Sequence, residues 1–207
     1  DFLKSKRVPA FVEIDRTVSS MGALYRYFRF RSEFSAEPDV VDVNSEEIDR
    51  LIEKARRAGR NFLMSYEAGR VMELIGVPVP RGIVAQNIVE AIVAAEKIGY
   101  PVVMKVISRD ILHKSDSGGV ALNLENKNEI IDAYQAIIQN CKTVNPDVHI
   151  EGVEISEMAP PGIEMIIGAR VDAVFGPIIM CGLGGVHVEI MKDVAFRSLP
   201  VSRKEAM

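Results

Sequence analysis

From Lys105 to Val120 the sequence reads K-V-I-S-R-D-I-L-H-K-S-D-S-G-G-V, an apolar run that turns into a polar loop and closes on two glycines. Lys105 interrupts the run Pro101–Ile107, whose composition predicts a β-strand. A lysine inside such a strand is costly unless its ammonium emerges at a ligand or partner, and a phosphate suits that role. The alternative is a lysine that extends along the sheet surface to reach water.

The loop after this run combines His113, Lys114 and Ser115 with the glycine pair Gly118-Gly119. Glycines let backbone N–H groups approach an anion closely, so the loop is a candidate phosphate loop. A neutral imidazole can attack a phosphoryl group beside a cation, which makes His113 a candidate catalytic residue. The alternative for His113 is an ordinary surface histidine. The loop does not match the G-x-x-x-x-G-K-[ST] pattern of P-loops.

A pair of glutamates flanks a proline-rich turn in the second half of the chain. Glu157 ends one predicted strand and Glu164 begins the next, with Met158-Ala159-Pro160-Pro161-Gly162 between them. One interpretation is a hairpin with solvated ends. The other is a hinge, where backbone groups at Glu157 and Met158 meet an adenine edge and Glu164 binds ribose hydroxyls. The later run Gly182–His187 fails the G-x-G-x-x-G template and predicts a glycine turn between strands.

Helices and strands alternate along the middle of the chain. Capping residues and glycines predict helices from Asn44 to Gly59, Ser65 to Gly76 and Asn87 to Gly99, and apolar spacing predicts another from Ile130 to Cys141. Strands are predicted at 82–85, 101–107, 119–124, 150–158, 163–172, 177–181 and 186–190. The helix after Ser65 is expected to face inward with Ala68, Val71, Met72 and Ile75. Helices early and strands late indicate α/β units followed by a more antiparallel lobe.

Both ends of the chain have unusual features. A strand at 8–12 and a helix behind Thr17 form one βα unit, and the polar stretch 29–44 predicts a linker. We therefore expect a preceding domain's tail at 1–36, a linker and helix at 37–60, and a main domain at 61–207. Because the chain starts with Asp1 and ends one turn into a helix behind Ser202, we expect it to be a piece of a longer protein.

Composition excludes several classes of protein. The chain has 25 basic and 29 acidic residues without long runs, so neither nucleic acid nor an anionic membrane is an expected partner. No apolar stretch is long enough for a membrane span or a signal peptide, which points to the cytoplasm. The two cysteines, Cys141 and Cys181, lack metal-site spacing and are expected to be small core residues.

Five motifs in order resemble the ATP-grasp domain of ADP-forming acyl-CoA synthetases, the acetate–CoA ligases of the fused-chain type. They are Y-P-V-V-M-K-V at 100–106, H-K-S-D-x-G-G-V at 113–120, S-E-M-x-P-x-G-x-E at 156–164, D-x-x-F-G-P at 172–177 and G-L-G-G-V-x-V-E at 182–189. The resemblance covers about 61–207. The region before Asn44 is similar, more weakly, to the closing βα unit of a CoA-ligase domain.

The resemblance implies an α/β (α+β) ATP-grasp fold of two lobes, with the C-terminal lobe incomplete. It implies an acid–thiol ligase reaction in which acyl-CoA, ADP and phosphate give the free acid, CoA and ATP by way of phosphohistidine. In this resemblance His113 is the catalytic, phosphorylatable residue. The nucleotide-binding residues are Lys105, Lys114, Ser115, Gly118, Gly119, Glu157, Met158 and Glu164.

The same resemblance implies what this chain lacks. Its cofactors are ATP or ADP with Mg²⁺, whose ligands are expected beyond residue 207, and its partner is a CoA-ligase domain or subunit that carries the main phosphohistidine. The chain alone is expected to be inactive, and the complete protein to be an oligomer. The alternative is a non-catalytic, synthetase-like regulatory module of a protein lysine acetyltransferase. The sequence does not indicate the acyl group or distinguish ADP from GDP.

Overall fold

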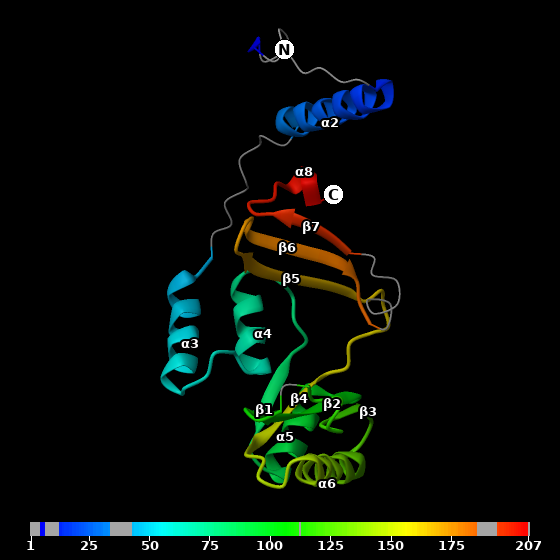
Figure 1. Cartoon of the computed structure of the whole chain (residues 1–207). Coiled ribbons are helices and arrows are strands. Elements are labelled where there is room, and N and C mark those ends of the chain that lie inside the picture. The colour runs from blue at the N-terminus through cyan, green and yellow to red at the C-terminus, as the bar shows by residue number, and fades with distance from the viewer. Residues whose placement is uncertain (1–4, 7–12, 34–42, 112, 186–193, 207) are drawn as a thin grey trace. The chain divides into compact units, whose positions relative to one another are not determined.

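The computed structural model describes residues 5–6, 13–33, 43–111, 113–185 and 194–206. They belong to two compact units, Val41–Pro161 and the combination of Asp1–Val40 with Gly162–Met207, and each is described by itself. Figure 1 labels the elements of both. Helix α2, Ile14–Glu33, confirms the predicted helix and continues into the segment predicted as a linker. The predicted strand at 8–12 lies outside the described residues.

Helix α3, Ser45–Arg57, begins and ends where its sequence predicts. The Asn44 side-chain oxygen accepts a hydrogen bond from the Glu47 amide at 3.2 Å, which satisfies one of the free amides of the first turn. At the other end, the Gly59 amide donates to the Arg56 carbonyl at 2.9 Å and the Arg60 amide to the Ala55 carbonyl at 3.0 Å. These bonds satisfy the last carbonyls of the helix.

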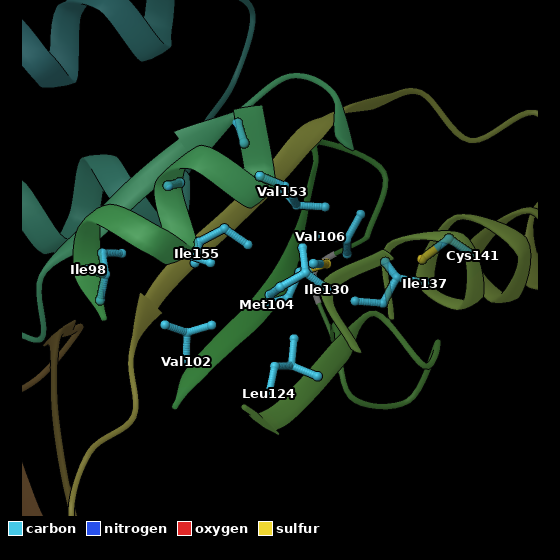
Figure 2. Packing of buried hydrophobic residues seen from close by; sticks show 14 of the residues in the cluster. Ile98, Val102, Met104, Val106, Leu124, Ile130, Ile137, Cys141, Val153 and Ile155 are labelled. Atoms are coloured by element: carbon cyan, nitrogen blue, oxygen red, sulfur yellow. The ribbon is translucent and has the colours of Figure 1, made fainter. Parts of the chain in front are cut away.

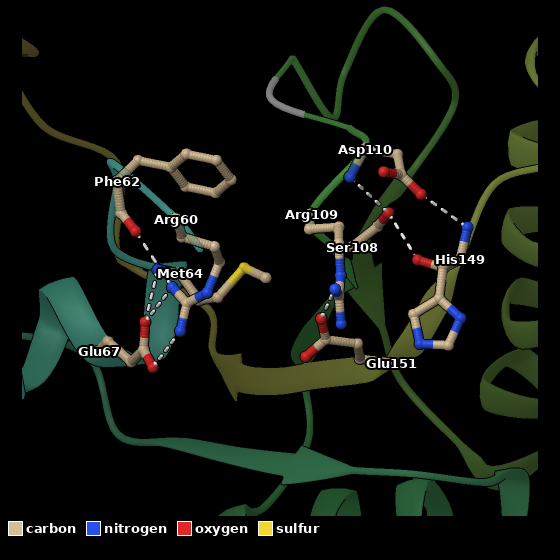
Figure 3. A network of polar contacts seen from close by, with 9 residues as sticks. All are labelled: Arg60, Phe62, Met64, Glu67, Ser108, Arg109, Asp110, His149 and Glu151. Carbon is tan, nitrogen blue, oxygen red and sulfur yellow. Dashed lines mark hydrogen bonds and ion pairs between the residues drawn. The ribbon is translucent and has the colours of Figure 1, made fainter. Parts of the chain in front are cut away.

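A buried ion pair fixes the start of helix α4, Ser65–Leu74 (Figure 3). Glu67 is 1% exposed and accepts hydrogen bonds from the Arg60 guanidinium at 2.7 and 2.9 Å and from the Met64 amide at 2.9 Å. The prediction that α4 turns Met72 and Ile75 inward is wrong, since they are 41% and 37% exposed. Glu67 takes the buried position instead, and Met72 lies about 140° further round the helix.

Four antiparallel strands form the sheet of the Val41–Pro161 unit. Their order is β1 (Gly82–Ala85), β4 (Ile150–Glu157), β2 (Val102–Ser108) and β3 (Val120–Leu124). Helices α5 (Ile88–Ile98) and α6 (Lys127–Val144) pack against them. Each helix begins behind an asparagine whose side-chain oxygen accepts from backbone amides, Asn87 for α5 and Asn126 for α6.

The core of this unit lies between the sheet and these two helices (Figure 2). Alternate residues of β2 and β4 point into it, among them Met104, Val106, Val153 and Ile155, all fully buried. Ile130, Ile137 and Cys141 of α6 pack against them. Since one face of the sheet packs against this core, the residues between these positions point to the opposite face.

The other unit contains a three-stranded antiparallel sheet, in the order β5 (Met165–Asp172), β6 (Gly176–Leu183) and β7 (Val194–Ser198). The predicted strand at 186–190 lies outside the described residues, and β7 was not predicted. The motif D-x-x-F-G-P forms the β5–β6 turn, where the Asp172 carboxylate accepts from the amides of Val174 and Phe175 at 2.9 and 3.1 Å. The predicted final turn of helix is α8, Arg203–Ala206.

The two cysteines differ in their surroundings. Both are free thiols, and Cys141 is buried as predicted, whereas Cys181 is exposed. The expectation of a core position for Cys181 is therefore wrong. The register pairs Cys181 with Ile167 on β5, which is itself exposed, so both lie on an open face of this sheet. In the part of the chain that the structure describes, no helix is long and apolar enough to cross a membrane.

Candidate functional site

The face of the four-stranded sheet opposite the core carries a row of residues that includes two charges. The strand register pairs Val84 with Glu154, Glu154 with Lys105, and Lys105 with Val120, so the row crosses all four strands. Directly opposed residues in antiparallel strands share a face, and this row is one residue out of step with the core row. Lys105 is therefore held by a rigid element, half-buried, next to one carboxylate.

The predicted phosphate loop closes on itself and is tied to β2. The Gly119 amide donates to the Lys114 carbonyl at 2.7 Å and the Gly118 amide to the Ser115 carbonyl at 3.1 Å. The Val106 amide of β2 donates to the Gly119 carbonyl at 2.8 Å, which holds the end of the loop at the strand. The loop therefore has a fixed shape and a fixed distance from Lys105.

Both glycines of the loop are required by space or conformation. Gly118 has φ +64°, a conformation that side chains disfavour, and a Cβ there would meet the Asn140 amide nitrogen at 2.7 Å. A Cβ on Gly119 would lie 2.6 Å from Val106 Cγ1 and 3.0 Å from the Lys114 carbonyl oxygen. From the sequence, these glycines are expected to let backbone amides approach an anion. In the structure their amides donate inside the loop.

Other amides of the loop are available instead. Among the described residues, the backbone N–H groups of Ser115, Asp116 and Ser117 have no hydrogen-bond acceptor. Ser115 and Asp116 are exposed, so their amides lie at the open end of the turn. The Ser117 hydroxyl donates to the Lys114 carbonyl at 3.0 Å, which helps to keep the turn closed. Successive free amides in a turn form a concave site for an anion.

Lys114 points back from the loop to the row on the sheet. Its ammonium donates to the Ser65 hydroxyl at 2.8 Å, and that hydroxyl donates to the Glu154 carboxylate at 2.6 Å. Burial lowers the pKa of Lys114; the Glu154 carboxylate opposes this shift and the Lys105 ammonium adds to it. Two lysines and one carboxylate therefore lie within electrostatic reach of one another, and the net charge of these three groups is positive.

His113 stands at the entrance to the loop and its side chain is exposed. It directly precedes Lys114, whose carbonyl accepts the hydrogen bond from Gly119 that closes the loop. The structure therefore brings the predicted residues Lys105, Lys114, Ser115, Gly118 and Gly119 together, with His113 at the same loop. An exposed imidazole is accessible to a phosphoryl donor, whereas a buried one is not.

The predicted adenine-edge residues lie at the end of β4. The Glu157 amide donates to the Arg81 carbonyl at 3.0 Å, and the Glu157 carboxylate accepts from the Arg81 amide at 3.0 Å and from its guanidinium. These bonds from the Arg81 backbone and side chain lower the pKa of Glu157. Met158 follows the strand and is exposed. The Glu157 side chain is thus engaged in holding the strand exit.

Glu164 belongs to the other unit and lies beside its glycine turn. The Glu164 carbonyl accepts from the Gly184 amide at 2.7 Å, and a Cβ on Gly185 would lie 2.6 Å from Glu164 Oε2. The turn predicted from Gly182 to His187 therefore contacts this carboxylate closely at its described residues. The lack of side chains at Gly184 and Gly185 leaves room for the Glu164 side chain.

Three residues that lie at these sites were not predicted from the sequence. Ser65 was interpreted only as a helix start, although its hydroxyl links Lys114 to Glu154. Glu154 is a carboxylate inside the strand G-V-E-I-S, the same signal that singled out Lys105. Arg81 stands directly before β1, and no local pattern connects it with Glu157, since the contact joins residues 76 apart.

Comparison with known proteins identifies the family. A model of the ATP-grasp domain family matches residues 54–207, about three quarters of the chain. The chain belongs to the ATP-grasp family. Within it, the chain is 46% identical over 157 residues to the Pyrococcus furiosus protein named acetate–CoA ligase [ADP-forming] I subunit beta, covering 76% of this chain and 67% of that one.

Two further relatives define the branch of the ATP-grasp family. The Nitrosopumilus maritimus 4-hydroxybutyrate–CoA ligase [ADP-forming] is 38% identical over 206 residues, which is 100% of this chain but only 30% of that protein. A solved structure of the acetyl-coenzyme A synthetase 1 of Ca. Korarchaeum cryptofilum, in complex with coenzyme A, Ca-AMPCP and HgCl+, matches with a TM-score of 0.74 and 44% identity. It covers 76% of this chain and 69% of that one.

These relatives confirm the resemblance to the ADP-forming acyl-CoA synthetases and the ATP-grasp fold of mixed helices and sheets. The three named proteins are ligases or synthetases, and they give no support to the alternative of a regulatory module. The chain spans only part of the length of each relative. The positions assigned to individual site residues and the predicted domain boundaries stay predictions.

Proposed function

We propose that this chain binds ADP or ATP and carries a phosphoryl group in an ADP-forming acyl-CoA ligase. The observation that carries the proposal is the position of two lysines and a loop with free amides at one face of a rigid sheet: Lys105 lies in β2, and loop 114–119 is bonded to β2 and sends Lys114 to the same row of residues. Ammonium groups and backbone amides are the usual donors to phosphate oxygens, and here both are pre-positioned. Relatives of this chain are ADP-forming CoA ligases, and one was solved with the nucleotide analogue AMPCP.

His113 is the phosphoryl carrier in this proposal. In the ATP-forming direction, a β-phosphate oxygen of ADP attacks the phosphorus of phosphorylated His113. The new P–O bond forms as the N–P bond breaks, and the electron pair of the N–P bond stays on the imidazole nitrogen. Lys105 and Lys114 offset the negative charge of the two phosphate groups that must approach each other. The imidazole is exposed, so phosphoryl donor and acceptor can both reach it.

The nucleoside part of the ligand is assigned to the two glutamate sites. Backbone groups at Met158, beyond the strand exit held by Arg81 and Glu157, bind the adenine edge. Glu164 is assigned to the ribose hydroxyls, and its carboxylate lies beside Gly184 and Gly185, which have no side chains to cover it. Adenine binding needs hydrogen-bonding groups and a surface that the planar base can approach. The exposed Met158 side chain supplies an apolar surface of this kind.

The fold family also implies Mg²⁺, which when bound would offset the negative charge of the nucleotide phosphates. In the described residues, no group of three or more His, Cys, Asp or Glu side chains is gathered as a metal site. The donor set of the described residues does not fit the ion, so none of these residues is assigned to Mg²⁺. The expected partner is a CoA-ligase domain or subunit, in keeping with the relative that is named a beta subunit.

Phosphate labelling tests this proposal in the complete protein. Incubation with ATP labelled at the γ-phosphate is expected to leave acid-labile phosphate on a peptide that contains His113. The His113→Asn variant is expected to lose that label. His149→Asn is the matched control, because His149 is also exposed and only its backbone is engaged, with the Asp110 carboxylate and the Ser108 hydroxyl (Figure 3). Full CoA-ligase turnover by His113→Asn would refute the carrier role.

A further inference from the structure

Ser65 stands between a cation and an anion and contacts both. Its hydroxyl donates to Glu154 Oε2 at 2.6 Å and accepts from Lys114 Nζ at 2.8 Å. The first contact is a short hydrogen bond to a carboxylate, which fixes the hydroxyl proton on the Glu154 side. The lone pairs of the oxygen then face the ammonium. The Ser65 hydroxyl therefore lies between the Glu154 carboxylate and the Lys114 ammonium, with its proton toward the carboxylate.

The position of Ser65 is fixed by buried groups. It is the first residue of α4, and the Arg60–Glu67 ion pair and the Met64 amide bond hold this end of the helix. On the other side, Glu154 lies in β4 between Val84 and Lys105, and its carboxylate lies 3.0 Å from the site of a Cβ on Gly82. Helix start and sheet are thus both rigid supports for the hydroxyl.

The interposed hydroxyl leaves Lys114 with unused hydrogen-bond donors. An ammonium has three N–H donors, and one is used by Ser65. In the described part of the chain, no carboxylate lies within ion-pair distance of Lys114 Nζ. A direct ion pair with Glu154 would pull the ammonium to the carboxylate and satisfy it. The hydroxyl keeps the two charges one hydrogen bond apart.

We propose that Ser65 is a positioning residue for polyphosphate binding: with Glu154 it holds the Lys114 ammonium beside Lys105, with donors left for the phosphates of a nucleoside di- or triphosphate. This inference rests on the proposed function. Ser65 does not need to contact the ligand, since it acts through Lys114. Without the hydroxyl, Lys114 loses its anchor and is free to pair directly with Glu154.

Binding titrations of the complete protein with ADP and with adenosine test the role. Ser65→Ala is expected to lower ADP affinity by about 10-fold or more, the usual effect of one hydrogen bond to a charged group. Adenosine affinity is expected to stay unchanged, because adenosine has no phosphate. Ser65→Thr keeps the hydroxyl and is expected to bind ADP nearly as the unmodified protein does.

A pH series adds a second readout. The charged groups that act on Lys114 in the described structure are Lys105 from β2 and Glu154 from β4. Glu154→Gln removes the only one that favours the protonated amine, so ADP binding is expected to weaken at a lower pH than in the unmodified protein. An unchanged pH profile would count against the role of Glu154 in the link.

Three other results would overturn the inference. If the Ser65→Ala variant binds ADP as tightly as the unmodified protein, Ser65 has no positioning role. Equal losses for ADP and adenosine indicate that Ser65 only supports the fold. If the unmodified protein binds ADP no tighter than adenosine, the proposed function itself fails, and the inference fails with it.

Discussion

Replacing Gly119 by alanine is expected to strain the loop that carries Lys114. The added methyl group would lie 2.6 Å from Val106 Cγ1, 3.0 Å from the Lys114 carbonyl oxygen and 3.3 Å from the Ser117 hydroxyl. Val106 is fully buried in the core, so it cannot move aside without disturbing its neighbours. Overpacking of this kind costs about 1–3 kcal/mol.

Gly69→Ala is the matched control for this change. Gly69 lies inside α4, and apart from its chain neighbours and the backbone of its own helix no described atom lies within 4 Å of the position of a Cβ there. Alanine at an unstrained helical position stabilises a protein by roughly 0.5–1 kcal/mol. The two substitutions add the same methyl group and are therefore expected to change stability in opposite directions.

Urea unfolding and ADP titration measure both effects. Gly119→Ala is expected to lower the unfolding midpoint and, because Lys114 and the free amides shift with the loop, to weaken ADP binding. Gly69→Ala is expected to raise the midpoint and leave ADP binding unchanged. A Gly119→Ala protein with the stability and ADP affinity of the unmodified protein would refute the packing described for the loop.

Three further predictions concern the supports of the site. Glu67→Gln leaves Arg60 buried without its anion and is expected to destabilise the protein by about 3–5 kcal/mol in urea unfolding; a loss of under about 1 kcal/mol would contradict this. Burial acts to raise the pKa of Glu67, but the bonds from Arg60 and Met64 outweigh it and the pKa is lowered. The stability that Glu67 provides is therefore present above its unfolded pKa of about 4.5 and is lost as pH falls through the lower folded value. The Glu67→Gln variant is expected not to show this loss of unfolding free energy at acid pH. Gly185→Ala places a methyl group 2.6 Å from Glu164 Oε2 and is expected to weaken adenosine binding. Equal adenosine affinities of the variant and the unmodified protein in a titration would disprove this.

Local signals predicted most of the elements near the site. Asn44, Asn87 and the glycines after each helix set helix ends within a residue or two, because capping depends on neighbours in sequence. Strand β1 was predicted with its observed bounds. The rotation of α4 was not predicted, since a buried Glu67 is permitted only by Arg60, seven residues earlier, and periodicity treats a charged residue as exposed.

The site was predicted in part for a similar reason. Lys105 stood out because a charge inside an apolar strand is anomalous in itself, and the same logic applied to Glu154 would have found its neighbour. Ser65 gave no signal, because a serine at a helix start is ordinary and its two partners lie 49 and 89 residues away. These contacts depend on how the start of α4, the loop and β4 pack together in three dimensions, which no local sequence pattern specifies.

Calorimetric titration of ADP into the complete protein and its Lys105→Met variant tests the central claim most directly. The claim is that the sheet face with Lys105 and loop 114–119 binds the phosphates of a nucleotide. Methionine keeps the length and apolar character of the side chain, so only the charge and its donors are removed. ADP affinity is expected to fall by about 10- to 100-fold while adenosine affinity stays the same. Equal ADP affinity in the two proteins would contradict the account.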